Sequence, residues 1–216
     1  MKENIFITGG TGYIGRRLIK TLLAERKYTV KTLVRKGSEK KLPDGCEIIF
    51  GDALDADTYK HLVTEHCTFI HLVGVSHPSP AKREQFKKID LVSVEEAVKA
   101  ASYAKTRHFI YLSVSQFPSS VMRNYQQTRK YGERLLKASG IPCTFLRPWY
   151  VLGPGHWWPV ILQPLFFLAK MISCWRKFIE QREFITIRQM IAALRIAVKN
   201  APMYIMIMEI EDMKRL

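Results

Sequence analysis

The sequence predicts an α/β protein with a doubly wound parallel sheet of the Rossmann type, and three observations support this. Short β-branched or aromatic runs alternate with longer amphipathic segments along most of the 216 residues, as in sheets that are covered by helices on both faces. A glycine-rich segment from Gly9 to Gly15 directly follows the first of these runs. The chain is 47% hydrophobic, which is enough apolar material for a full core.

Strands and helices are predicted in alternation up to Pro148, and the rhythm then changes. A turn at Gly153-Pro154-Gly155 leads into an aromatic cluster and an apolar segment, and a last strand–helix–strand unit follows. Residues 1–150 are therefore predicted to form a dinucleotide-binding core, and residues 151–216 a small C-terminal cap that completes the same domain. The expected strands are 4–8, 29–34, 47–50, 68–73, 108–113, 143–147, 184–187 and 204–210, and the expected helices are 12–25, 56–64, 82–104, 126–139 and 188–199.

The glycine-rich segment has the spacing of a site for a pyrophosphate. Gly9 allows a sharp turn off the strand, Gly12 allows the backbone to approach the phosphates, and Gly15 allows the helix to pack close to the sheet. The N–H groups of the first helical turn and the helix dipole then face the anion. We therefore expect a bound dinucleotide, with Thr11, Tyr13 and Ile14 among its further contacts.

The end of the second strand predicts which dinucleotide is bound. Val34 is followed by Arg35 and Lys36, with no acidic residue for an adenosine ribose. An arginine fork suits the extra phosphate of NADP, so NADP is expected in preference to NAD. The alternative is a solvated pair of surface cations.

Asp52 and Ala53 follow the third strand and are expected beside the adenine. The Asp52 carboxylate could accept a hydrogen bond from the adenine amino group, or it could cap the helix that follows. The pattern alone leaves both readings open.

With these motifs in place, the chain resembles the short-chain dehydrogenase/reductase superfamily, in its atypical and extended branch, over essentially its whole length. It is similar to NmrA-like proteins and to the NADPH-binding accessory subunit of respiratory complex I. The resemblance implies that the ends of the fourth and fifth strands and the segment after the sixth line the cofactor. The residues at these positions are Leu72, Val73, Gly74, Ser113, Pro148 and Tyr150.

Enzymes of this superfamily use a Tyr, a Lys four residues later and a Ser on the fifth strand. The resemblance implies that the Tyr hydroxyl exchanges a proton with the substrate oxygen, while the cation supports it and binds ribose and the Ser orients the substrate. The matching residues are Tyr125, Arg129 in place of the Lys, and Ser115, with Ser113 on the same strand face. The alternatives are a partly buried aromatic for Tyr125 and strand-end capping for the serines.

We therefore expect an NADP-dependent oxidoreductase for a small, largely apolar carbonyl or alcohol. The competing hypothesis is a non-catalytic NAD(P)H-binding sensor or scaffold, because Arg129 replaces the usual Lys. The short C-terminal stretch makes a nucleotide-sugar substrate improbable. No nucleic-acid-binding motif and no set of metal ligands is recognisable, so neither partner is expected.

The net charge of +15 is spread along the chain. It fits anionic ligands, a contact with nucleic acid or with an anionic membrane, or only the composition of the host proteome. Trp157 and Trp158, ahead of the apolar stretch 160–175, could wall a pocket, pack onto the sheet, or contact a membrane peripherally. That stretch is too interrupted to span a bilayer, and the start of the chain does not resemble a secretory signal. The four cysteines show no paired spacing, so a cytoplasmic protein is expected.

Overall fold

A computed structural model describes residues 2–76, 78–155 and 183–216. Its main feature is a seven-stranded sheet in which every pair of neighbouring strands is parallel, in the order β3-β2-β1-β4-β5-β6-β9. The predicted fold class is confirmed. The main-sheet strands are β1 (Glu3–Thr8), β2 (Tyr28–Val34), β3 (Glu47–Phe50), β4 (Thr68–His71), β5 (His108–Leu112), β6 (Cys143–Leu146) and β9 (Ile205–Met208).

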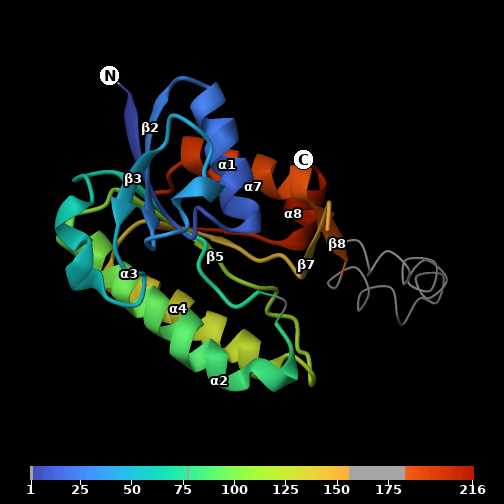
Figure 1. Cartoon of the computed structure of the whole chain (residues 1–216). Helices are drawn as coiled ribbons and strands as arrows, with labels where there is room; N and C mark the ends of the chain where they lie inside the picture. Colours follow the sequence, from blue (N-terminus) through green and yellow to red (C-terminus); the bar gives the residue numbers. More distant parts are fainter. Residues whose placement is uncertain (1, 77, 156–182) are drawn as a thin grey trace.

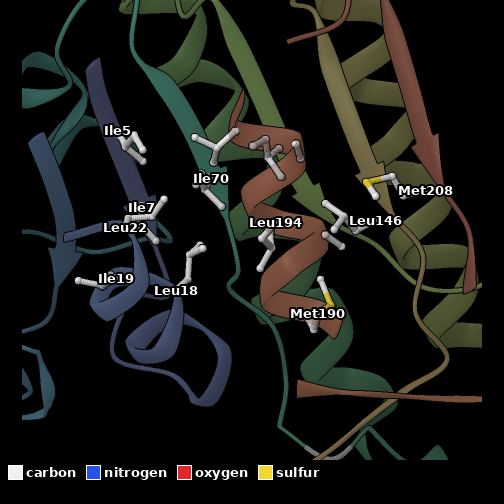
Figure 2. Close-up of a cluster of buried hydrophobic side chains, with 14 of the residues drawn as sticks. Ile5, Ile7, Leu18, Ile19, Leu22, Ile70, Leu146, Met190, Leu194 and Met208 are labelled. Carbon is white, nitrogen blue, oxygen red and sulfur yellow. The ribbon is translucent and has the colours of Figure 1, made fainter. Parts of the chain in front are cut away.

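Helices cover both faces of this sheet (Figure 1). Helices α1 (Tyr13–Ala24) and α7 (Ile187–Lys199) pack on one face, while α3 (Val92–Tyr103) and α4 (Arg123–Ser139) pack on the other. The alternation of β1 explains both cores, because Ile5 and Ile7 join the α1–α7 side and Phe6 joins the α3–α4 side. Figure 2 shows the first cluster, in which Leu194 of α7 lies among strand and α1 side chains.

The strand order reverses between β1 and β4, and this reversal positions the site. The chain runs from β1 outward to β3 and then returns to place β4 on the other side of β1. The loops that leave β1 and β4 therefore separate at the carboxyl edge of the sheet, where a crevice forms in open α/β folds.

One predicted helix is wrong in type. Residues 56–64 contain two 3₁₀ turns, η2 (Ala56–Thr58) and η3 (Lys60–Leu62), instead of an α-helix. Tyr59 separates them with φ −145°, and its ring is fully buried and stacked on Phe6. Anchoring this side chain in the core interrupts the helical backbone, which local propensity does not reveal.

The segment before α3 is also less regular than predicted. The expected helix 82–104 begins with η4 (Pro80–Lys82) and α2 (Arg83–Gln85), and the π-helical turn η5 (Phe86–Leu91) leads into α3. Single π-helical turns of this kind often occur at functional sites. The buried Asp90 lies in this turn.

The described C-terminal residues contain the predicted strand–helix–strand unit. However, its first strand, β8 (Phe184–Thr186), pairs with β7 (Tyr150–Leu152) in a separate two-stranded parallel sheet. Thr186 then begins α7 with a reciprocal capping box to Gln189. Strand β9 extends the main sheet, and the short helix α8 (Ile210–Lys214) follows it.

Trp157, Trp158, Cys174 and the apolar stretch 160–175 lie outside the described residues. Within the described ranges, no helix is both long and apolar enough to cross a membrane. Cys46, Cys67 and Cys143 are free thiols, and the latter two are buried.

A buried histidine joins three elements and predicts how stability depends on pH. His71 of β4 is within hydrogen-bond distance of Thr8 of β1 (2.8 Å) and Ser93 of α3 (3.3 Å). Burial, and secondarily the charge of Arg129, lowers the pKa of His71 to about 3, and burial likewise lowers the pKa of His108 to about 4. Both side chains are therefore neutral in the folded protein but gain a proton on unfolding below the ordinary His pKa of about 6.5.

We expect the free energy of unfolding to decrease as the pH falls below 6.5, because the unfolded state then binds more protons. Between pH 7.5 and pH 5.0 the contribution of His71 to this decrease is about 2 kcal/mol. Urea denaturation of His71→Asn at both pH values should show about half of the wild-type decrease. A His61→Asn control at an exposed position should retain the full decrease, and an unchanged decrease in His71→Asn would contradict the assignment.

Candidate dinucleotide-binding site

The loop between β1 and α1 is shaped so that two glycines have no substitute. Gly9 has φ +80°, and a Cβ there would lie 2.8 Å from the backbone carbon of Leu72. A Cβ on Gly15 would lie 2.4 Å from the Gly9 carbonyl oxygen. The loop thus packs against the end of β4 and under its own helix without room for side chains.

The N-terminus of α1 is free to receive an anion. Gly12 is its N-cap, no side chain caps the first turn, and this turn contains no acidic residue. Its N–H groups and the positive end of the helix dipole therefore face the crevice, which suits a pyrophosphate.

Two adjoining grooves run from this loop along the carboxyl edge of the sheet. The first, of about 480 Å³, is called here the Arg35 groove. The second, of about 260 Å³, is called the Tyr125 groove. Gly9, Gly12, Leu72 and Gly74 line both, so the grooves meet at the glycine loop and the end of β4.

All of the residues predicted to contact the cofactor line one or both of these grooves. In addition to the four predicted residues that line both grooves, the Arg35 groove is lined by Thr11, Arg35, Asp52, Ala53 and Val73. The Tyr125 groove is lined by Tyr13, Ile14, Gly15, Ser113, Pro148 and Tyr150 from the predicted set, and by Tyr125 itself.

Residues that the sequence did not single out also line the Arg35 groove. Ser38 and Lys82 are among them, and the Lys82 ammonium donates to the Ser76 carbonyl (2.5 Å) at the groove's wall. With Arg35, two cationic side chains therefore border this groove.

Asp52 closes a turn of its own chain while lining the groove. Its Oδ1 accepts from the Leu54 N–H (3.0 Å), whereas the 3₁₀ turn that follows is capped by Asp55, whose Oδ1 accepts from the Asp57 N–H. Asp52 is thus not the N-cap of the next helical element. Its carboxylate is one of the groups that line the Arg35 groove.

The predicted catalytic residues are not all in one place. Tyr125 of α4 and Ser113 after β5 line the Tyr125 groove together. Ser115 lines a different groove, with Glu209 and Glu211, and its Oγ is 3.5 Å from the Phe117 N–H. Among the described residues, the serine that shares a groove with Tyr125 is therefore Ser113.

Arg129 lies behind the groove wall and lines neither of the two grooves. It is only 3% exposed, and its guanidinium pairs with Asp90 of η5 at 2.6 Å. It also donates to the carbonyls of Val73 (3.3 Å) and Leu112 (3.1 Å), and its guanidinium carbon lies 5.3 Å from the Tyr125 ring centroid. The arginine thus ties the ends of β4 and β5 to α4.

Asp90 completes this attachment and was missed by the sequence analysis. Its Oδ2 accepts from the Val75 N–H (3.1 Å), so the Asp90–Arg129 pair holds the loop after β4 from both sides of Gly74. Burial raises the pKa of Asp90, and Arg129 opposes that rise. The available signal was a lone carboxylate between Ile89 and Leu91 in an apolar helical pattern.

A second buried ion pair lies behind Ser113. Glu133 of α4 is 2% exposed and accepts from Nε (2.9 Å) and Nη2 (2.5 Å) of Arg147, in a bidentate pair. The Ser113 hydroxyl donates to Glu133 Oε1 at 2.7 Å, and Arg147 also reaches Glu209 at 2.7 Å. The hydrogen bond to Glu133, and secondarily the one to Glu209, raises the pKa of Arg147 above its ordinary value.

A glycine loop with no room for side chains, an uncapped helix N-terminus and a groove at the strand-order reversal define a dinucleotide-binding α/β protein. The comparison with protein families identifies the group. The family described as NAD(P)H-binding matches residues 9–154. The chain belongs to this NAD(P)H-binding family, within the short-chain dehydrogenase/reductase superfamily, and the resemblance inferred from the sequence is confirmed.

Curated relatives include reductases and epimerases. The chain is 24% identical to an uncharacterized sugar epimerase, YhfK, of Bacillus subtilis over 67% of its own length and 70% of that protein. It is 25% identical to UDP-glucose 4-epimerase of Vibrio cholerae (72% and 54%) and 26% identical to ceramide reductase of Caulobacter vibrioides (70% and 47%). The chain thus spans about half the length of the last two relatives.

Solved structures share the fold at low sequence identity. The Bordetella bronchiseptica enzyme WbmH in complex with NAD⁺ has a TM-score of 0.69 at 19% identity, with 97% of this chain and 76% of that one covered. A UDP-galactose 4-epimerase has a TM-score of 0.70 at 17% identity, with 95% and 77% covered.

Proposed function

We propose that the protein is an NADP-dependent oxidoreductase that reduces a small, largely apolar carbonyl compound or oxidises the corresponding alcohol. The observation that carries this proposal is that Tyr125 and Ser113 line a groove that adjoins the glycine loop. A proton-transferring hydroxyl is therefore available beside the bound dinucleotide. The test is the turnover of Tyr125→Phe with NADPH and an apolar carbonyl substrate.

The residues present fit a dinucleotide in one orientation. The glycine loop and the open N-terminus of α1 would hold the pyrophosphate. The Arg35 groove would take the adenosine half, beside Arg35 and Asp52, and the Tyr125 groove the nicotinamide half. When bound, the nicotinamide supplies or accepts a hydride.

The protein's own residues would handle the proton. In reduction, the Tyr125 hydroxyl would donate its proton to the carbonyl oxygen as the carbonyl carbon receives the hydride, which yields an alcohol and leaves a tyrosinate that regains a proton from water. In oxidation, the same proton and hydride move in reverse. Arg129 would act indirectly, because with Asp90 it holds the loop after β4 against the groove.

The groove walls favour an apolar substrate. Leu112, Val114, Trp149 and Val151 line the Tyr125 groove together with Ile14. The reductase among the relatives acts, by its name, on ceramide, which also supports a carbonyl or alcohol on an apolar molecule.

Preference for NADP rests on Arg35. Arg35 is exposed and lines the Arg35 groove together with Ser38. It follows a strand that ends without an acidic residue. We expect Arg35→Ala to weaken NADPH binding by about 10- to 100-fold, as for a charge-assisted hydrogen bond of 1.5–3 kcal/mol, and NADH binding by less than about threefold. Titrations that follow tryptophan fluorescence would measure both. Lys36→Ala, at the adjacent cation outside the groove, is the control, and equal losses for the two cofactors would contradict the assignment.

A non-catalytic NAD(P)H sensor is the second candidate. The observation that favours it is that the residue at the usual Lys position, Arg129, is buried in an ion pair and lines no groove that could receive ribose. In that case the protein binds the dinucleotide, but carbonyl reduction does not depend on Tyr125.

A further inference from the structure

The hydroxyl of Ser113 has only one proton, and this proton is directed to Glu133 in a hydrogen bond. The Ser113 Oγ donates to Glu133 Oε1 at 2.7 Å, a distance typical of a strong O–H···O bond. Ser113 is 3% exposed, and its small accessible area lines the Tyr125 groove. The hydroxyl thus points its proton away from the groove and into the protein.

Glu133 is held so that it can only accept. Two nitrogens of the Arg147 guanidinium donate to its two oxygens, at 2.9 and 2.5 Å, in a bidentate ion pair. A carboxylate in such a pair has no proton to return to a neighbour. Since Arg147 is itself anchored to Glu209 (2.7 Å), the arrangement is fixed at both ends.

The remaining capacity of Ser113 is therefore that of an acceptor. We propose that Glu133 is a positioning residue, which orients Ser113 so that the groove selects a hydrogen-bond donor on the nicotinamide nucleoside. This inference rests on the proposed function, because it requires that the nicotinamide half occupies the Tyr125 groove. The nucleoside offers this chemistry from two sources, the carboxamide N–H and the ribose hydroxyls.

The first experiment measures dinucleotide affinity in matched serine variants. Ser113→Ala should raise the Kd for NADPH by about three- to tenfold, the effect of one neutral hydrogen bond. Ser115→Ala, two residues along and facing a different groove, should leave the Kd unchanged. Adenosine 2′,5′-bisphosphate, which lacks the nicotinamide half, should bind both variants as it binds the wild type.

A dinucleotide analogue separates the two sources of the donor. The 3-acetylpyridine analogue of NADPH keeps the ribose and a carbonyl oxygen but lacks the carboxamide N–H. If the carboxamide is the donor, Ser113→Ala weakens NADPH and not the analogue. If a ribose hydroxyl is the donor, both lose affinity equally. Either pattern supports the proposal, and unchanged binding of both overturns it.

The role of Glu133 is tested by coupling. Glu133→Leu/Arg147→Met replaces the buried ion pair by apolar side chains, a change that proteins often tolerate. In this background the Ser113 hydroxyl is no longer oriented, so Ser113→Ala should cost less than about twofold in NADPH affinity. A cost equal to that in the wild type would show that Glu133 has no positioning role. If this background does not fold, the serine pair and the analogue still decide whether Ser113 accepts from the nucleoside.

The outcomes distinguish this inference from the proposed function. Failure of the wild type to bind NADPH would overturn both. Tight NADPH binding that is insensitive to Ser113→Ala would overturn the inference alone.

Discussion

Tyr125→Phe is expected to lower the turnover of a carbonyl substrate with NADPH by about 10²- to 10⁴-fold, the usual contribution of a positioned acid or base. The substitution removes only the hydroxyl, so the ring can keep its contacts with Phe86 and the Arg129 guanidinium. NADPH affinity and melting temperature should therefore stay close to the wild-type values. Steady-state rates of NADPH oxidation with a panel of apolar ketones and aldehydes would measure the loss.

Tyr131→Phe on the same helix is the matched control. Tyr131 is 41% exposed and lines neither of the two grooves, so its loss should not change turnover. Equal rates in Tyr125→Phe and the wild type, with NADPH binding intact in both, would contradict the oxidoreductase proposal and favour the sensor.

Gly15→Ala is expected to weaken NADPH binding by at least about tenfold and to lower the melting temperature. Gly15 lies in the first turn of α1, and on helix propensity alone this change would stabilise by at most about 1 kcal/mol. The new Cβ, however, would lie 2.4 Å from the Gly9 carbonyl oxygen and 2.7 Å from the Gly10 Cα. Backbone on both sides must then shift, which typically costs about 1–3 kcal/mol and moves the amides that face the pyrophosphate.

Lys20→Ala provides the control for Gly15→Ala, because Lys20 is exposed on the same helix. Calorimetric titration with NADPH and thermal denaturation of both variants separate the two effects. If Gly15→Ala bound NADPH as the wild type does, the tight packing of the loop under α1 would not be needed for binding.

Most of the sheet was predictable because its interior strands are short, continuous apolar runs, and such runs indicate strands that are buried on both faces. The apolar runs of β1, β4, β5 and β6 lie in the sheet interior, and their predicted ranges differ from the observed ones by no more than two residues. The type of the segment 56–64 was not predictable, because burial of Tyr59 against Phe6 depends on a residue 53 positions earlier in the chain. The pairing of β7 with β8 likewise joins segments that are distant in the sequence.

The residues of the candidate site likewise fall into those that the sequence predicted and those that it did not. The glycine loop and Arg35 were predicted because each depends on local backbone geometry and on its position at the end of a strand. The choice between Ser113 and Ser115 was not, because the chain bends after β5 and turns the two side chains into different grooves. Asp90 and Glu133 were missed because a buried carboxylate is recognisable only once its arginine partner is in place.

The sequence by itself thus determined the class of fold and the position of the glycine loop, since strand burial and glycine spacing are properties of short segments. Only the tertiary structure decided that Arg129 supports the loop after β4 from behind the groove and that the Ser113 hydroxyl donates its hydrogen bond to Glu133. These roles follow from contacts between α4 and the ends of β4, β5 and β6. The physical reason is that the direction of a hydrogen bond or ion pair is set by the partner, and the partner comes from elsewhere in the chain.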